Sequence, residues 1–450
     1  MAYTAFITRI KNLRQHPNAD RLQMGECFGN TVIVSMDYTD NQLGVYFPSD
    51  GQLSVSFADA NNLLRKKDAD GNNIGGYMDP DKRNVTAIKL RGEKSDGLFL
   101  PLTALESFGD ISCLREGDRI DTFNGHEICC KYVPKRNHRS GGASKGNRTR
   151  KKKAPVAPLF TEHADTEQLA YNLSAFKPGD EIEITLKMHG TSQRTAYLPV
   201  FKGYKRTLFD KIARKEGTPI YDWGYVSGTR RTVLENYDGG YYGSNEFREQ
   251  HSKFFEGKLW KGEEVYYEVV GFTHTGVGIM ASCDNKRLND KEFVKQYGKD
   301  TVFSYGCHPA AWHELHQSDI YVYRMTMTNE DGDIVEYTPD FMRYRCEQMG
   351  VKTVPVMWKG AIPSSEEALN LGGYMNAGEY IKDVAEDYYD GPDPIGKTHV
   401  REGVVVRILN RPKFCAYKHK NWSFKALEGI VKVEAEAPDM EEAEDENTES

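Results

Sequence analysis

The chain has 450 residues, more than one hydrophobic core usually accommodates, so we expect two domains joined by a linker. Its formal net charge is −7, but a basic central stretch and an acidic end divide that charge unevenly, so the overall sign does not exclude a nucleic-acid partner. The eight cysteines contain no Cys-x-x-Cys pair, Met1 to His16 has no signal-peptide core, and no run of about 18 apolar residues occurs. We therefore expect a soluble, intracellular and cytoplasmic protein with no membrane partner.

Residues 1–133 carry short strand-like runs interrupted by two short helical stretches. The expected strands are Ala2–Ile10, Thr31–Met36, Leu43–Phe47, Val85–Leu90, Gly97–Leu100 and Arg119–Phe123, and the expected helices are Ala58–Lys66 and Leu102–Phe108. Asn124-Gly125 after the last strand is a strong hairpin signal. Many short strands with one or two helices are typical of a small Greek-key barrel of the OB kind, which binds oligonucleotides, although other small barrels show the same pattern.

Residues 134–158 form a predicted flexible basic linker. Lys135 to Lys153 carries nine Lys and Arg residues among Gly, Ser and Asn, without apolar periodicity. This charge would attract a phosphate backbone without reading its sequence. Two alternatives are a nuclear-localisation signal at Arg150–Lys153 and a linker that is merely solvated.

Residues 159–433 show an α+β pattern. Asp180 to Leu186 alternates polar and apolar residues, which predicts a strand with one buried face. Lys187 ends this strand beside His189 and Gly190, where a turn would leave backbone amides free for a phosphate. This arrangement suits covalent chemistry on a phosphoanhydride, although surface lysines beside turns are common.

The rest of this region mixes helices and strands. The expected helices are Glu246–Phe255, Asp290–Gln296, Pro339–Met349, Glu366–Tyr374 and Tyr380–Tyr388, with a hairpin at 321–338 and a last strand at Gly429–Glu434. Lys202–Lys215 is a basic, partly helical insertion, either lying along nucleic acid or simply solvated. Cys307, His308, His313 and His316 lack a second cysteine pair, which favours a structural role without zinc. The acidic residues 434–450 predict a disordered tail.

Several segments resemble, in order, the motifs of one enzyme family. Lys187–Ser192 resembles the nucleotide-binding lysine motif of ATP-dependent RNA ligases, members of the covalent nucleotidyltransferase superfamily. The later motifs of that family resemble Thr229–Thr232, Tyr266–Gly271, Asp319–Tyr323, Arg401–Val406 and Ala416–Lys420. Each match is weak alone, and their joint order carries the resemblance, which spans Phe160 to Leu427. His16–Leu22 and Leu90–Gly97 are similar to OB modules that bind tRNA and to the N-terminal module of the nick-sealing branch.

The resemblance implies a domain organisation and an activity. Residues 1–133 would be an OB-fold nucleic-acid-binding domain, and residues 159–433 an ATP-grasp-like ligase adenylyltransferase domain with antiparallel sheets and helices. The enzyme would use ATP and Mg²⁺ or Mn²⁺ to join 3′-hydroxyl and 5′-phosphate ends of RNA, at nicks in a duplex. It would pass through a lysyl-AMP and an adenylylated 5′ end, with AMP as product, as in RNA repair.

The resemblance also implies roles for single residues. Lys187 would be the nucleophile that receives AMP, and Glu402 the carboxylate associated with the metal ion. The remaining site residues would bind nucleotide or neutralise phosphate: His189, Gly190, Arg230, Arg231, Glu268, Tyr323, Lys418 and Lys420. Glu268 would accept from the ribose hydroxyls and Tyr323 would stack on adenine. Only one of Arg230 and Arg231 can face the nucleotide from a strand, and we favour Arg231 because it directly precedes Thr232.

Two positions depart from the family pattern. Tyr267 stands where glycine is usual and is expected to narrow the nucleotide pocket, and Arg324 stands where aspartate is usual. Taken one at a time, the site residues also fit exposed strand faces, turns or core positions. Two other functions therefore stay open: an mRNA-capping-type guanylyltransferase and a catalytically inactive RNA-binding protein with an OB module. The strand that must be RNA, the template, the host and the oligomeric state stay open too.

Overall fold

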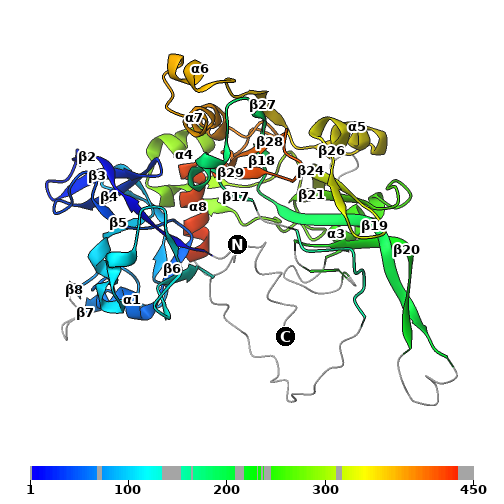
Figure 1. Ribbon diagram of the computed structural model, residues 1–450, viewed down its shortest axis with the longest axis horizontal. Coiled ribbons are helices and arrows are strands. Elements are labelled where there is room, and N and C mark those ends of the chain that lie inside the picture. The colour runs from blue at the N-terminus through cyan, green and yellow to red at the C-terminus, as the bar shows by residue number, and fades with distance from the viewer. Residues whose placement is uncertain are drawn as a thin grey trace.

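The computed structural model describes residues 3–67, 73–133, 154–163, 166–207, 217–230, 232–234, 237, 245–310 and 317–433. The basic linker up to Lys153, the acidic tail 434–450, and Arg231, His313 and His316 lie outside these residues, so the predictions made for them stay untested. The described chain mixes strands and helices: small sheets precede the linker, and two larger sheets follow it (Figure 1).

The part before the linker consists of short, mostly antiparallel strands around two apolar clusters. Its main sheet has the order β12-β5-β1-β13, and a second sheet has the order β2-β3-β4. Ile7, Val45 and Phe47 from the main sheet pack with Phe57 and are fully buried. The bounds are β1 Ala5–Arg9, β2 Lys11–Gln15, β3 Leu22–Cys27, β4 Asn30–Ser35, β5 Leu43–Phe47, β6 Gly51–Leu53, α1 Val55–Ala60, β7 Lys66–Lys67, β8 Asn73–Gly75, β9 Asn84–Val85, β10 Ala87–Leu90, β11 Glu93–Asp96, β12 Leu98–Pro101, β13 Arg119–Ile120, β14 Thr122–Phe123, β15 His126–Glu127 and β16 Cys129–Lys131.

Local signals in this part had mixed success. The hairpin predicted at Asn124-Gly125 is confirmed, since both residues have positive φ between β14 and β15. The helix predicted at Ala58–Lys66 is wrong in its bounds: Ser54 caps α1 by accepting from Phe57 N, and the helix ends at Ala60 before Asn62, whose φ is +52°. Leu102–Phe108 is a 3₁₀ helix, as the helical pattern there predicted. The OB assignment stays a prediction.

Two large sheets build the part after the linker. The five-stranded sheet has the order β17-β29-β28-β18-β27, and the other contains β20-β19-β21-β24-β25, with β26 paired to β24. Helix α7 packs on the first sheet, and α3 and α5 pack on the second. The bounds are β17 Glu167–Gln168, β18 Glu181–Lys187, β19 Thr191–Lys205, β20 Thr218–Gly228, α3 Glu246–Phe254, β21 Glu263–Gly271, β22 Cys283–Asp284, α4 Lys291–Tyr297, β23 Asp300–Thr301, β24 Ser318–Thr328, β25 Ile334–Glu336, α5 Pro339–Met349, β26 Lys352–Thr353, β27 Val356–Ala361, α6 Glu366–Leu371, α7 Ala377–Tyr389, β28 Gly403–Ile408, β29 Ala416–Lys420 and α8 Trp422–Val433.

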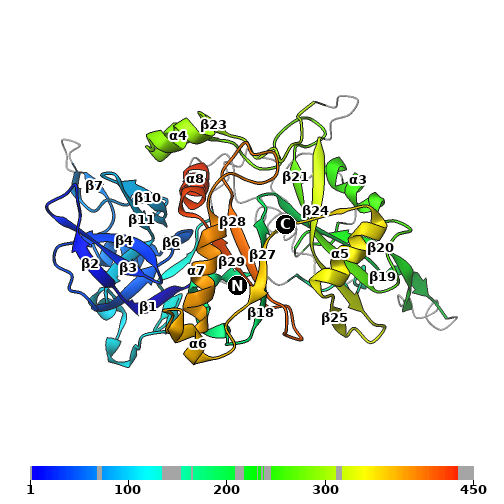
Figure 2. The same cartoon turned by 90° about the horizontal axis from the view of Figure 1, so that it is seen from above.

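Helix α8 joins the two parts of the molecule (Figure 2). The Lys425 ammonium lies 2.6 Å from the Asp96 carboxylate, and Trp422 Nε1 donates to the Ser95 carbonyl. Ala426 and Leu427 share an apolar cluster with Ala87 of β10. The strand predicted at Gly429–Glu434 is wrong, because Trp422, Ala426, Leu427 and Ile430 recur at helical spacing and bury one face of a helix here.

Other sequence expectations can be checked against this fold. The predicted segments His16–Leu22 and Leu90–Gly97 meet, since His16 Nε2 lies 3.2 Å from the Leu90 carbonyl oxygen. The basic insertion is not helical over Lys202–Lys205, which belongs to β19, and positions 208–216 lie outside the described residues. All eight cysteines are free thiols. Within the described ranges no helix is long and apolar enough to cross a membrane.

Candidate active site

Strand register brings the nucleophile candidate to its partners. Lys187, the last residue of β18, lies opposite Gly403 at the start of β28, and Gly403 lies opposite Lys420 of β29. Glu402 directly precedes Gly403, so its side chain lies between those of the two lysines. Gly403 has a φ of +148°, and a Cβ there would lie 2.0 Å from the His419 carbonyl oxygen. The close approach of these strands therefore requires glycine after Glu402.

A buried carboxylate holds two ammonium groups at this point. Lys187 Nζ lies 2.7 Å and Lys420 Nζ 3.2 Å from Glu402 Oε1, and Lys420 also pairs with Glu428 at 2.9 Å. Glu402 is 1% exposed. Burial alone would raise the pKa of its carboxyl group, but the ammonium groups of Lys187 and Lys420 outweigh burial and hold that pKa well below its ordinary value. Glu402 is therefore an anion at neutral pH.

His189 is held rigidly beside this carboxylate. Its Nδ1 lies 3.7 Å from Glu402 Oε2, and its ring makes edge contacts with Phe303 and Phe424 at 4.5 and 4.6 Å. The His189 backbone N–H donates to the Tyr305 hydroxyl at 2.7 Å. Phe303 and Phe424 therefore hold the His189 ring in place, and Tyr305 holds its backbone. A residue that orients a phosphate needs a ring fixed in this way.

The first pocket lies between the two sheets and opens to solvent. Its empty volume, which includes part of that open space, is about 910 Å³. Lys187, Arg230, Glu268 and Tyr323 all line it. Tyr323 comes from β24 and Glu268 from β21, and the Tyr323 hydroxyl lies 3.0 Å from Ser192 Oγ. Polar groups converge here on an otherwise largely apolar wall, an arrangement typical of small-molecule sites.

The neighbouring strand residue Tyr267 does not narrow this pocket as its position suggested. Its side chain is fully buried on the opposite face of β21, where it packs with Phe255, and its hydroxyl lies 2.9 Å from Thr195 Oγ1. The reason is strand alternation: consecutive side chains point to opposite faces, so Tyr267 points into the core when Glu268 points into the pocket.

Arg194 ties the arginine-motif segment to the sheet. This fully buried guanidinium donates to the Thr229 carbonyl at 2.9 Å, to Glu264 at 2.9 Å and to the Thr161 carbonyl, and lies 3.8 Å from the Phe160 ring centroid. These contacts position the segment that continues into Arg230. Arg230 lines the first pocket and also a second pocket that adjoins it. The strand expected at Arg230 is wrong, since β20 ends at Gly228 and Arg230 lies in a bend after it. The preference for Arg231 over Arg230 is untested, because Arg231 lies outside the described residues.

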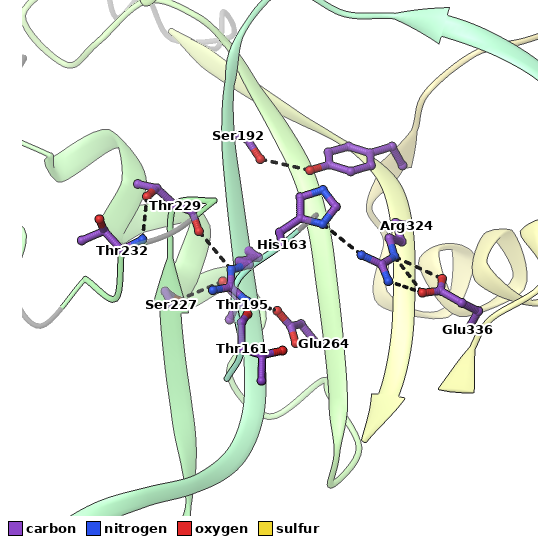
Figure 3. A network of polar contacts seen from close by, with 12 residues as sticks. Thr161, His163, Ser192, Thr195, Ser227, Thr229, Thr232, Glu264, Arg324 and Glu336 are labelled. Carbon is purple, nitrogen blue, oxygen red and sulfur yellow. Dashed lines mark hydrogen bonds and ion pairs between the residues drawn. The ribbon is translucent and has the colours of Figure 1, made fainter. Parts of the chain in front are cut away.

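His163 is a pocket residue that no sequence pattern indicated. Arg324 Nη1 lies 2.9 Å from His163 Nδ1, and Arg324 also forms an ion pair with Glu336 (Figure 3). Because a guanidinium only donates, His163 Nδ1 must accept, which leaves the hydrogen of the neutral ring on Nε2. The departure at Arg324 is thereby explained: its side chain orients a pocket histidine. His163 belongs to no motif, and only tertiary structure places it here.

A second pocket adjoins the first and shares Thr166, Lys187, Met188 and Arg230 with it. It is lined by His189, Gly190, Glu402, Lys418 and Lys420, and also by Asp50 and Lys131 from the part before the linker. Lys418 and Lys420 share a strand face, whereas His419 between them stacks on Tyr389 at 4.7 Å. Four lysines thus surround one cavity, whose chemistry suits a polyphosphate. The sequence did not predict the contribution of Asp50 and Lys131.

The donor set limits how a metal ion could bind. Across the described ranges, no group of three or more His, Cys, Asp and Glu side chains is arranged to hold a metal. Glu402 lines the second pocket together with Asp50, Glu428 and four lysines, and this donor set fits a largely hydrated divalent cation that also contacts phosphate oxygens. Zinc at Cys307 and His308 finds no support within this part of the chain, and the two other histidines of that cluster lie outside it.

Comparisons with solved structures identify the fold. An RNA ligase variant from Naegleria gruberi, solved with ATP and Mn, matches with a TM-score of 0.54 and 16% identity over 94% of this chain and 98% of that chain. The same enzyme with PPi matches with a TM-score of 0.53 and 17% identity over 93% and 96%. Another variant with AMP and Mn matches with a TM-score of 0.54 and 16% identity over 94% and 97%.

The likeness covers both parts of the molecule and establishes a shared fold. No protein-family model matches the chain, and no curated protein is similar enough in sequence to match.

Proposed function

We propose that this protein is an ATP-dependent RNA ligase that joins 3′-hydroxyl and 5′-phosphate ends at nicks in a duplex. One observation carries the proposal: Lys187 Nζ meets the buried Glu402 carboxylate beside Lys420, where the first pocket adjoins the lysine-lined second pocket. The fold supports it, since RNA ligase structures with ATP, AMP and PPi share this architecture. Both the lysyl-AMP intermediate and the preference for nicks belong to the proposal.

The first transfer would use Lys187 as the nucleophile. Its amine attacks the α-phosphorus of ATP, a phosphorus–nitrogen bond forms, and pyrophosphate leaves. An ordinary lysine is neutral in fewer than about one molecule in a thousand at pH 7. Lys418 and Lys420 favour the neutral amine by adding positive charge nearby, whereas Glu402 favours the ammonium form. A divalent cation bound at Glu402 would add positive charge beside both the amine and the phosphate.

The two pockets divide the nucleotide between them. The first would take the adenosine, with the Tyr323 ring against the base and the Glu268 carboxylate accepting from the ribose hydroxyls. The second would take the phosphates, which Arg230 and the lysines would neutralise. The leaving pyrophosphate would then lie on the side of the cavity that Lys131 lines.

The remaining transfers return Lys187 to its starting state. A 5′-phosphate oxygen of one RNA end attacks the lysyl-AMP phosphorus, the phosphorus–nitrogen bond breaks, and the AMP-capped end carries a pyrophosphate linkage. The 3′-hydroxyl of the other end then attacks the RNA phosphorus of that linkage, forming a phosphodiester and releasing AMP. The same cations would stabilise charge in each transfer, since all three occur at phosphates beside Lys187.

Covalent labelling tests the first transfer. The protein, Lys187→Ala and the control Lys359→Ala are incubated with ATP labelled at the α-phosphorus and Mg²⁺ or Mn²⁺, then denatured. Lys359 lies on β27 of the same sheet, is 45% exposed and pairs with Asp340, so it controls for loss of a lysine. We expect label on the wild-type protein and Lys359→Ala and none on Lys187→Ala; label that persists in Lys187→Ala overturns the assignment.

Two further outcomes separate the alternative functions. Labelling by GTP in place of ATP would indicate a capping-type guanylyltransferase, and labelling by neither nucleotide would indicate an RNA-binding protein without catalysis. A panel of nicked duplexes with RNA or DNA on each side of the nick then tests the sealing step. Equal sealing of nicked and fully single-stranded ends would contradict the preference for nicks.

A further inference from the structure

The hairpin of β19 and β20 extends well beyond its sheet. Strand β19 pairs with β21 only from Thr191 to Ala196, whereas its pairing with β20 continues to Lys205 opposite Thr218. Residues 198–205 and 218–224 therefore form a two-stranded ribbon outside the sheet, here called the arm. It projects on the side away from the part before the linker (Figures 1 and 2). A free two-stranded ribbon is marginally stable, so other contacts must hold it.

One face of the arm is used for folding. Leu198 and Val200 pack with Ala157 and Phe160, residues of the segment that follows the linker. The same segment runs along the arm, since Phe201 N donates to the Val156 carbonyl at 2.7 Å and Ala154 N to the Tyr204 hydroxyl at 3.1 Å. The end of the linker is thus anchored along the β19 edge of the arm, and Leu198 and Val200 are covered on this face.

The other face carries a row of aromatic rings. The register places Tyr197 opposite Tyr225, Pro199 opposite Trp223 and Phe201 opposite Tyr221, all on one face. Tyr197 and Tyr225 stack at 4.7 Å near the core, and Trp223 lies 5.8 Å from Tyr197. Farther out, Phe201 lies 6.0 Å from Tyr221. Phe201, Tyr221 and Trp223 are only half-buried, so their ring surfaces remain accessible.

The arm is locally basic in a chain of negative net charge. Lys202, Lys205 and Arg206 stand against Asp222, and all four are exposed. The two arm lysines lie on the face opposite the rings: Lys202 Nζ would lie 3.4 Å from a Cβ on Gly224, and Lys205 lies opposite Thr218. On the ring face, the Lys261 ammonium lies 5.2 Å from the Trp223 ring centroid. Accessible rings beside Lys261, on a ribbon whose other face is basic, suit a ligand with both flat faces and phosphates.

We infer that the arm binds a single-stranded nucleic acid, an unpaired stretch of the RNA strand whose paired end lies at the nick beside Lys187. Unpaired bases can stack on the rings while the cations contact the backbone. A duplex offers only phosphates to this surface, because its bases are already stacked on each other. The identification of this strand as the RNA substrate rests on the proposed ligase function.

The arm's length sets how long such a strand must be. Lys205 lies 14 residues beyond Thr191 (205 − 191), which at about 3.3 Å per residue is roughly 45 Å. At about 3.4 Å per stacked nucleotide, this corresponds to roughly 13 nucleotides. Counted from the end at Lys187, a strand of about 5 nucleotides should therefore not reach the end of the arm, whereas one of about 20 should pass along it.

The test compares full-length proteins that differ only at the ring face of the arm. Trp223→Ala removes the central ring, Trp223→Phe keeps a ring, and Lys261→Ala removes the cation beside that ring. Binding of RNA oligonucleotides of about 5 and about 20 nucleotides, and of a 20-pair duplex, is measured by fluorescence anisotropy at several salt concentrations. Labelling of Lys187 by α-labelled ATP is measured in parallel and reports on the proposed function separately.

We expect Trp223→Ala to weaken binding of the long oligonucleotide by about 5- to 100-fold, with Trp223→Phe close to wild type. Lys261→Ala should lower the salt dependence by about 0.7, the value for one lost phosphate contact on a single strand. The short oligonucleotide and Lys187 labelling should be unchanged. Unchanged binding of the long oligonucleotide overturns the inference, as does a loss confined to the duplex. If ATP does not label the wild-type protein, the proposed ligase function is refuted, whereas the inference about the arm is not.

Discussion

Asp393 is the buried carboxyl group whose titration the structure predicts most sharply. It is fully buried in the turn between α7 and β28, its Oδ1 accepts from Ile395 N at 2.7 Å, and no donor among the described residues reaches Oδ2. Burial raises the pKa of this group from 3.8 to about 7. Asp393→Asn keeps the Oδ1 contact and imitates the protonated acid, so it isolates the effect of the charge.

The sign and size of the effect follow from linkage. In the folded state Asp393 keeps its proton up to about pH 7, whereas in the unfolded chain it loses the proton near pH 4. The folded state therefore binds more protons than the unfolded chain between those pH values. The free energy of unfolding therefore falls as pH rises through that window. At about 1.4 kcal/mol per pH unit, the largest possible loss is about 4 kcal/mol, and water reaching the turn would reduce it.

The assay is denaturant unfolding of wild-type protein, Asp393→Asn and the control Asp387→Asn from pH 4 to pH 8. Asp387 lies on the exposed side of α7, so its variant should follow the wild type. We expect Asp393→Asn to match the wild type near pH 4 and to exceed it by up to about 4 kcal/mol near pH 8. A difference between Asp393→Asn and wild type that is constant over this range would refute the reasoning.

Three further variants test other parts of the structure. A Cβ on Gly190 would lie 2.4 Å from the Val269 carbonyl oxygen, so Gly190→Ala should lower the free energy of unfolding by about 1–3 kcal/mol; unchanged stability would show that the turn can relax. Lys425→Met leaves Asp96 buried without its cation and should cost about 3 kcal/mol, most of it recovered by adding Asp96→Asn; an equal loss in the double variant would contradict the ion-pair explanation. Tyr323→Ala should raise the ATP concentration for half-maximal labelling about 5- to 100-fold, whereas Tyr323→Phe loses only the hydroxyl contact and should change it less than about fivefold; equal effects would exclude stacking.

Local patterns predicted several strands and helices of the second part. Hydrophobic periodicity found β18, and helix patterns found α3, α4, α5 and α7 to within a few residues. The pattern failed at Gly429–Glu434, because an apolar run of that length fits either a strand or the last turns of a helix. Packing of Leu427 against the first part of the molecule decided in favour of the helix.

The sequence by itself determined which residue types could do the chemistry: a lysine at a strand end, two lysines alternating on another strand, and a glutamate before a glycine. It determined this because side-chain direction along a strand has a period of two, whatever the fold. Only the tertiary structure decided that Lys187, Glu402 and Lys420 meet, because strand register joins positions that are more than 200 residues apart. The structure alone also added His163 and Lys131 to the pockets. Neither side chain has a local sequence signal, since long-range packing places both.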